Sequence, residues 1–220
     1  MAKPLQKTNL HAWHVANNGR MVPFAGWEMP VQYPSGPVEE HRVTRTVAGL
    51  FDIDHMGQME VRGPDADAFV NHLTTYDARK MALYEAHYAL MCYPDGSVVD
   101  DIFIYKLPDE NGAVYYFIAI NAGNRHKDVQ WATIQATGYD VTLEDISDET
   151  FMIAFQGPKA PEILSRMTQK DLNEVPRFTA LFDTILGVPV LLGRTGYTGE
   201  DGFEIFFPAE HALKVWEGIL

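Results

Sequence analysis

Cysteine and basic residues are both scarce in this sequence, and each shortage excludes a class of protein. The 220 residues contain one cysteine, Cys92, which rules out a disulfide framework and any metal site built from several cysteines. Lysine and arginine together number 17 against 30 aspartates and glutamates, giving a net charge of −13. Because phosphate backbones and anionic membrane surfaces attract basic proteins, we expect neither nucleic acid nor a membrane as the main partner.

Long apolar runs and common cofactor motifs are also missing. No stretch approaches the roughly 18 apolar residues of a membrane-spanning helix, and the first residues lack the apolar core of a signal peptide, so we expect a cytoplasmic protein. The 8 histidines are scattered without metal-ligand spacing, so we expect no metal site. Neither Gly-x-Gly-x-x-Gly nor a P-loop motif occurs, which disfavours a Rossmann dinucleotide site and a P-loop nucleotide site.

The pattern that organises the chain is an internal repeat. Gly63-Pro64 and Gly157-Pro158 each follow an apolar, strand-like run and each begin a helical pattern. Apolar positions at i, i+3, i+4 and i+7 recur in both helices; they are Ala66, Phe69, Val70 and Leu73, then Ala160, Ile163, Leu164 and Met167. Because each apolar stripe needs a sheet to cover it, the repeat predicts two related α+β modules in one chain.

Between the two Gly-Pro turns, the order of expected elements predicts a ferredoxin-like module. Strands are expected at 88–92, 96–105 and 114–120, followed by a helix ending near Gly138 and a strand near 141–143. Together with the first Gly-Pro helix, these elements follow the order strand, helix, strands, helix, strand, which is typical of that module.

Outside this region the signals are less regular. Prolines, a glycine and Trp27 crowd residues 21–30, which predicts an ordered, buried loop. Gly36-Pro37 begins a helical pattern that extends to about residue 50. Residues 209–220 predict a last helix with one apolar stripe.

An acidic pair, Asp100 and Asp101, lies inside the apolar strand expected at 96–105. Successive side chains on a strand point to opposite faces, so the two carboxylates must have different surroundings. Their neighbours on both faces are apolar, and burying a carboxylate without partners is costly. Two interpretations stay open: one aspartate caps or pairs at a strand end while the other is solvated, or one of them faces a functional pocket.

A third strand carboxylate follows a glycine-rich loop. Residues 195–202 join two expected strands, 187–194 and 203–207, and their glycines allow a tight loop with an accessible backbone. Glu204 alternates with apolar neighbours and so points to the opposite face of its strand. Carboxylates, aromatic rings and glycine loops together suit a flat heterocycle, because a carboxylate accepts its N–H donors while an aromatic ring stacks on its face.

A series of motifs, in order along the chain, resembles the aminomethyltransferase (T-protein) family of the glycine cleavage system. They are Phe-Ala-Gly-Trp-Glu-Met-Pro at 24–30, Leu-Phe-Asp-Ile-Asp-His-Met at 50–56, Gly-Ser-Val-Val-Asp-Asp at 96–101, Gln-Gly-Pro at 156–158 and Arg-Thr-Gly-Tyr-Thr-Gly-Glu-Asp-Gly-Phe-Glu at 194–204. The resemblance implies an α+β folate-binding T-protein fold, of which the chain is the N-terminal two-domain portion without the C-terminal β-barrel domain. It also implies that a ferredoxin-like module, 56–146, is inserted in a discontinuous α+β module, 1–55 and 147–220.

The same resemblance implies an activity. The family takes the aminomethyl group from the lipoyl arm of H-protein, releases ammonia and delivers the carbon to tetrahydrofolate, its co-substrate. By motif, Asp101 is the catalytic acid and also contacts folate, and the other expected folate contacts are Tyr88, Asn121, Tyr197 and Glu204. Two alternatives stay open on the same scaffold: a non-catalytic folate-binding protein and a related folate-dependent demethylase. The sequence has Gly96-Ser97 where the family usually has two glycines.

Overall fold

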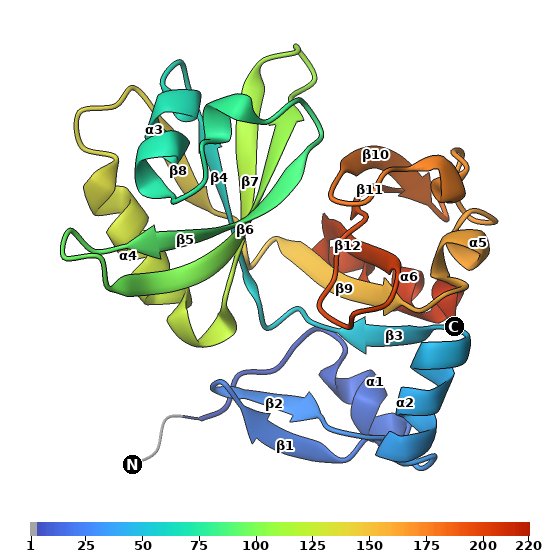
Figure 1. The fold of residues 1–220 in the computed structure, drawn as a ribbon. Coiled ribbons are helices and arrows are strands. Elements are labelled where there is room, and N and C mark those ends of the chain that lie inside the picture. Colours follow the sequence, from blue (N-terminus) through green and yellow to red (C-terminus); the bar gives the residue numbers. More distant parts are fainter. Residues whose placement is uncertain (1–3) are drawn as a thin grey trace. The chain divides into compact units, whose positions relative to one another are not determined.

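The computed structural model describes residues 4–220, which form two compact units (Figure 1). Unit 1 comprises the described residues up to His55, together with Glu149–Arg177 and Leu181–Leu220. Unit 2 comprises Met56–Asp148 and the short segment Phe178–Ala180. The chain therefore leaves unit 1, completes most of unit 2, and returns.

Unit 2 is built on a five-stranded antiparallel sheet with the order β5-β6-β7-β4-β8. Its elements along the chain are β4 (Gly57–Arg62), α3 (Ala66–Leu73), η1 (Ala78–Lys80), β5 (Ala86–Cys92), β6 (Val98–Pro108), β7 (Val114–Ile120), η2 (Ala122–Asn124), α4 (Arg125–Gln135) and β8 (Thr142–Asp145). Without β5, the remaining strands and helices have the βαββαβ order of a ferredoxin-like fold. The expected module is present, with β5 added at one edge.

The core of unit 2 lies on one face of this sheet. Residues of α3 and α4 pack in one cluster with Ile102 and Ile104 of β6. The apolar stripe of α3 is fully buried, as its helical spacing predicted. Because side chains alternate along β6, Asp100 points to this helix-covered face and Asp101 to the other face.

Unit 1 contains a second five-stranded sheet, with the order β10-β11-β12-β9-β3. Its elements are α1 (His11–Ala16), β1 (Met21–Phe24), β2 (Trp27–Pro30), α2 (Pro37–Thr46), β3 (Gly49–Asp52), β9 (Thr150–Gln156), α5 (Ala160–Leu164), η3 (Leu172–Glu174), β10 (Ala180–Ile185), β11 (Val188–Gly193), β12 (Gly202–Pro208), η4 (Ala209–His211) and α6 (Ala212–Ile219). Figure 1 shows β3 beside β9, although the main segment of unit 2, Met56–Asp148, separates them in the sequence. Residues of β9, β12 and α6 share the core of this unit.

The two sheets have the same strand order in permuted form. Elements β9, α5, β10, β11, β12 and α6 correspond in sequence and in sheet position to β4, α3, β5, β6, β7 and α4. In unit 2 the edge position beside β4 is occupied by β8, the last strand of that sheet in the chain. In unit 1 the equivalent position beside β9 is occupied by β3, the first strand of its sheet in the chain. The internal repeat in the sequence is thus a structural repeat, and the prediction of two related α+β modules is confirmed.

The Gly-Pro turns show why the repeat keeps glycine. Gly63 and Gly157 have positive φ angles of 128° and 143°. A Cβ atom would lie 2.4 Å from the Asp140 carbonyl oxygen at Gly63, and 2.5 Å from the Val47 carbonyl oxygen at Gly157. Both turns therefore press against the backbone that leads into the edge strand, β8 in one unit and β3 in the other.

Three sequence expectations for unit 1 need correction. Residues 21–30 form the hairpin β1–β2 rather than a buried loop, and Phe24 is 56% exposed. Helix α2 ends at Thr46, because Leu50 pairs with Phe155 in the sheet. The second Gly-Pro helix ends at Leu164, so Met167 packs on the core from beyond it. The last helix, α6, buries its apolar stripe as expected.

Candidate functional site

Asp101 lies on the face of the unit 2 sheet that is opposite to α3 and α4. On the adjacent strand β5, Leu90 lies opposite Asp101. The next pair along the same face is Tyr88 of β5 opposite Phe103 of β6. The ring of Tyr88 meets that of Phe103 edge to face, with centroids 4.6 Å apart, and Tyr88 is 48% exposed. The structure therefore places the exposed carboxylate of Asp101 on a face with aromatic and aliphatic neighbours.

Asn121, directly after β7, joins the two aspartates of β6. Its Nδ2 donates to Asp101 Oδ1 at 3.2 Å, to the Asp101 carbonyl oxygen at 3.0 Å and to Asp100 Oδ1 at 3.2 Å. These partners are all acceptors, so they fix the amide with its NH₂ group toward the aspartates. Asp101 and Asn121, both expected in the site from the resemblance, are thus in direct contact.

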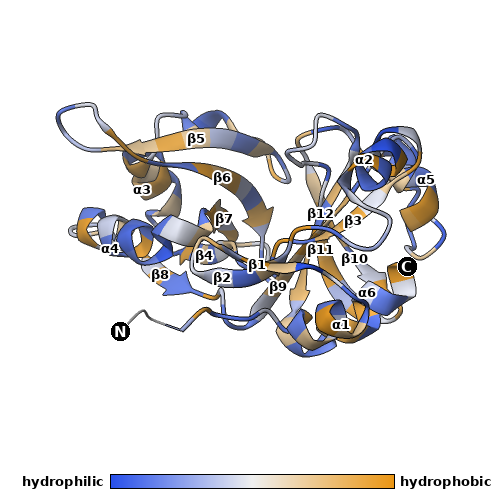
Figure 2. Ribbon diagram, turned by 90° about the horizontal axis from the view of Figure 1, so that it is seen from below, coloured by the Kyte–Doolittle hydropathy of each residue, from blue (hydrophilic) through white to orange (hydrophobic). Residues whose placement is uncertain are grey.

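Beneath this pair lies a carboxylate that the sequence analysis missed. Asp128 of α4 is fully buried, and burial together with the neighbouring carboxyl group of Asp100 raises the pKa of Asp128 to about 8. Asp100 itself is only 7% exposed. Lys127 Nζ lies 3.8 Å from Asp128 Oδ1 and donates to the carbonyl oxygen of Val99. Figure 2 shows hydrophilic and hydrophobic residues together on α4. In such a mixed helix the sequence gives no signal that distinguishes a buried aspartate from a solvent-exposed one.

Tyr197 lies in the loop between β11 and β12 of unit 1 and is 91% exposed. The buried Gln156 holds this loop, because its Nε2 donates to the Thr195 carbonyl oxygen and its Oε1 accepts from Thr198 Oγ1, each at 2.9 Å. The loop approaches so closely that a Cβ atom on Gly196 would lie 2.1 Å from Gln156 Oε1. Tyr197 therefore projects from an anchored loop.

An ion pair closes the base of the same loop. Arg194 donates from Nε and Nη2 to the two carboxylate oxygens of Asp201, at 3.0 and 2.5 Å. This guanidinium holds the pKa of Asp201 below its usual range. The remaining Nη1 group donates to the carbonyl oxygens of Leu172, Asn173 and Val175. Bidentate pairing of this kind fixes the geometry of both side chains.

Glu204 lies on β12 with small residues on both sides. Its cross-strand neighbours, Gly193 on β11 and Ala154 on β9, are both small residues. Thr195 Oγ1 donates to Glu204 Oε2 at 2.5 Å and so orients the side chain. The core of unit 1 contains Phe203 and Ile205, so Glu204 points away from it, as alternation predicted.

The expected site residues fall into two groups. Tyr88, Asp101 and Asn121 belong to unit 2, whereas Tyr197 and Glu204 belong to the β11–β12 hairpin of unit 1. Each group is formed within its own unit from neighbouring strands. Among the described residues 4–220, no cluster of His, Cys, Asp and Glu side chains could hold a metal ion, and no helix is long and apolar enough to cross a membrane.

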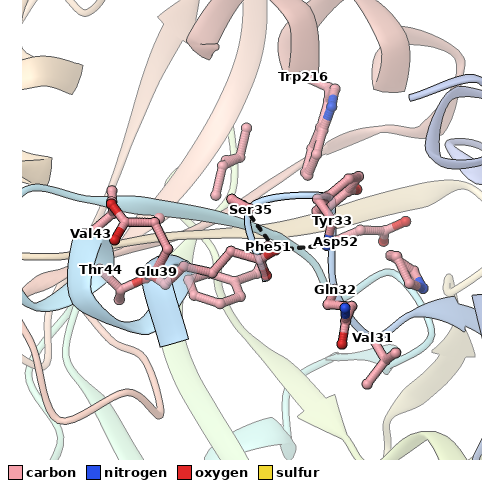
Figure 3. A pocket seen from close by; sticks show the side chains of 14 residues that line it. Val31, Gln32, Tyr33, Ser35, Glu39, Val43, Thr44, Phe51, Asp52 and Trp216 are labelled. Carbon is pink, nitrogen blue, oxygen red and sulfur yellow. Dashed lines mark hydrogen bonds between the residues drawn. The ribbon is translucent and has the colours of Figure 1, made fainter. Parts of the chain in front are cut away.

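Unit 1 also contains a separate cavity of about 360 Å³, which none of the expected site residues lines (Figure 3). Tyr33, Asp52 and Trp216 are among its lining residues. Buried His14 joins two of them, with Nδ1 2.6 Å from Tyr33 Oη and Nε2 2.8 Å from Asp52 Oδ2. No local sequence pattern predicts this network, because its members come from separate elements.

Comparison with known proteins gives the family. The family model described as the GCVT N-terminal domain matches residues 10–220. The chain belongs to this family. The expectation drawn from the motifs, that the chain resembles the N-terminal part of a T-protein, is thereby confirmed.

Curated relatives of this GCVT domain are aminomethyltransferases. That of Symbiobacterium thermophilum is 47% identical over 226 residues, covering 100% of this chain and 59% of the relative. That of Herpetosiphon aurantiacus is 45% identical over 217 residues, covering 98% and 58%. The chain therefore spans somewhat more than half the length of the curated relatives it matches.

Solved structures agree on the fold. The glycine cleavage system aminomethyltransferase T from Bartonella henselae superimposes with a TM-score of 0.89 at 30% identity, covering 98% of this chain and 57% of that one. A heterotetrameric sarcosine oxidase from Corynebacterium sp. U-96 matches with a TM-score of 0.58 at 16% identity, which shows a shared fold alone. The expected α+β T-protein fold is confirmed.

Proposed function

We propose that this GCVT domain is the folate-binding part of an aminomethyltransferase of glycine cleavage. The reaction moves the lipoyl-bound aminomethyl carbon of H-protein to tetrahydrofolate and releases ammonia. The observation that carries the proposal is the exposed carboxylate of Asp101, hydrogen-bonded to Asn121 and lying on a sheet face with Tyr88. The aminomethyltransferase names of the relatives support the same activity. The proposal includes a cytoplasmic location and the module boundaries expected from the sequence, with 56–146 inserted between 1–55 and 147–220.

The residues of unit 2 suit the reacting end of a reduced folate. Asp101 accepts N–H donors and stabilises positive charge that develops on a nitrogen during transfer. Asn121 holds this carboxylate in one orientation, since it binds both the side chain and the backbone of Asp101. Tyr88 offers an aromatic edge and face on the same side of the sheet. Tetrahydrofolate supplies the nitrogens that take up the one-carbon unit.

The residues of unit 1 suit the pterin ring. Glu204, between the small residues Gly193 and Ala154, accepts from an exocyclic amine and a ring N–H. Thr195 fixes its orientation, and Tyr197 offers an exposed ring from the anchored loop. The carboxylate of Glu204 therefore supplies the acceptors that the N–H groups of a pterin need.

Calorimetry tests this proposal. Tetrahydrofolate is titrated into the 220-residue protein and into Asp101→Asn and Glu204→Gln variants, each of which removes one charged acceptor. Losing a hydrogen bond to a charged group costs about 1.5–3 kcal/mol, so each variant should bind about 10- to 100-fold more weakly. Glu144→Gln, on exposed β8, removes an equal charge elsewhere and should bind like the wild type. Absence of heat beyond dilution for the wild type would refute the proposal.

Turnover separates catalysis from binding alone. Ammonia release is measured with aminomethylated, lipoylated H-protein and tetrahydrofolate. Folate binding with turnover abolished in Asp101→Asn supports the aminomethyltransferase. Folate binding without turnover in the wild-type chain would favour the non-catalytic folate-binding protein.

A further inference from the structure

Two buried carboxyl groups meet in unit 2 behind Asp101. Asp100 is 7% exposed and Asp128 is 0% exposed. If both were ionised, Asp128 Oδ1 and Oδ2 and Asp100 Oδ2 would have no hydrogen-bond donor among the described residues 4–220. Two buried carboxylates in contact cannot both carry charge at moderate cost. One proton between them supplies the missing donor.

Their other contacts decide which group holds the proton. Asp100 Oδ1 accepts a hydrogen bond from Asn121 Nδ2, so this carboxyl group already has a donor. Asp128 has no such donor within residues 4–220, because Lys127 Nζ at 3.8 Å is too far for a hydrogen bond. The charged groups that act on Asp128 are Asp100 and Asp101 on β6 and Lys127 on its own helix. Burial and the neighbouring carboxyl group of Asp100 raise its pKa, Lys127 lowers it, and the net shift leaves Asp128 protonated at neutral pH.

We propose that Asp128 is a positioning residue that keeps a proton at neutral pH and donates a hydrogen bond to Asp100, and so orients Asn121 and, through it, Asp101. The proposed bond from Asp128 to Asp100 extends two observed bonds, which the Asn121 amide donates to the carboxylates of Asp100 and Asp101. The importance of this network for catalysis rests on the proposed function of Asp101, but the existence of the network does not depend on that function.

Ionisation of Asp128 breaks this chain. The buried site then holds two like charges, and Asp100 loses the donor that keeps its carboxylate in place. Asn121 then loses a fixed position for one of its three acceptors, so its amide and the Asp101 carboxylate that it contacts are held less firmly. Asparagine at 128 retains an N–H donor and cannot ionise, whereas leucine has a similar size and no donor.

The first experiment needs no folate. The side-chain amide signals of Asn121 are followed by ¹⁵N–¹H NMR from pH 6 to 9.5 in the wild type, Asp128→Asn and Asp128→Leu. The wild-type signals should shift with a midpoint near pH 8, where Asp128 loses its proton. In Asp128→Asn this transition should vanish with the amide still ordered, and a folded Asp128→Leu should show a displaced amide at every pH. If Asp128→Leu does not fold, the Asp128→Asn titration decides alone. A wild-type amide that shows no transition, or one that survives in Asp128→Asn, would overturn the proposal.

The second experiment links the chain to binding. Wild-type affinity for tetrahydrofolate should fall about tenfold between pH 7 and 9.5, as expected for one hydrogen bond lost. Asp128→Asn should keep its affinity over this range, while Glu144→Gln should follow the wild type. Equal pH dependence in wild type and Asp128→Asn would contradict the link. If the NMR transition appears and folate does not bind at any pH, the positioning network stands and the proposed function fails.

Discussion

Replacing Asp128 by asparagine should change how the stability of unit 2 depends on pH. An aspartate in an unfolded chain has a pKa of about 3.9, whereas in the folded protein that of Asp128 is about 8. Between these values the unfolded state has released a proton that the folded state keeps. The free energy of unfolding therefore falls as pH rises, by about 1.4 kcal/mol per pH unit. Over the whole interval this loss is on the order of 5 kcal/mol, and above pH 8 it stops.

Asp128→Asn removes this dependence, because asparagine does not titrate. Relative to the wild type, the variant should gain about 1.4 kcal/mol per pH unit from pH 5 to 7, and the gain should level off above pH 8. Trp131 is the one tryptophan of unit 2, so its ¹⁹F signal in 5-fluorotryptophan-labelled protein reports the urea unfolding of that unit. Glu144→Gln serves as the control for lost charge. Parallel pH curves for wild type and Asp128→Asn would refute a buried, protonated Asp128.

Other substitutions test the turns, the loop and the acidic pair. Gly157→Ala should destabilise unit 1 by more than about 1–3 kcal/mol in urea unfolding, because it adds a backbone clash to a strained φ; Gly26→Ala, also at positive φ but with open space around it, should cost less. Gln156→Ala should speed hydrogen exchange in the loop that it anchors and weaken folate binding, and unchanged exchange would contradict that anchoring. Asp101→Asn should reduce turnover by about 10²–10⁴-fold, the loss typical of removing a positioned acid–base group, and Asp100→Asn should reduce it far less. Equal losses of turnover in two folded variants would contradict the assignment of Asp101.

Local periodicity allowed much of the fold to be predicted. The stripes of α3 and α6 and the strands β6, β7 and β12 follow directly from their apolar spacing. The Gly-Pro repeat could be recognised because both positions require glycine for the same reason, a positive φ and a backbone segment too close for a Cβ atom. These features depend on short stretches of chain, which the sequence displays directly.

Long-range pairing could not be predicted in this way. The pairing of β3 with β9 joins segments that the main segment of unit 2, Met56–Asp148, separates in the sequence, and no local signal predicts that pairing. The β1–β2 hairpin was hidden because Pro23 and Pro30 disfavour strands and because Ala25, a residue without a turn signature, adopts a φ of 49°. A two-residue turn ending in Gly26 was the one available sign.

The candidate site shows the same division. Alternation along β6 separated Asp100 from Asp101, but only the family resemblance selected Asp101 as the functional carboxylate. Asp128 was invisible for a physical reason: its burial comes from packing against another element, and its own helix gives the same pattern as a solvated one.

The alternation that separates the two aspartates also explains why a neutral replacement of Asp100 should be tolerated. Asp100 must accept from Asn121 on one side and contact Asp128 on the other. An asparagine there can accept with its Oδ1 and donate with its Nδ2, so Asp128 would ionise and become the acceptor. The hydrogen-bonded chain would then survive with one bond reversed and one buried charge, as in the wild type. Asp101 has no such substitute, because its carboxylate faces the opposite side of the sheet and its charge is what the proposed reaction uses.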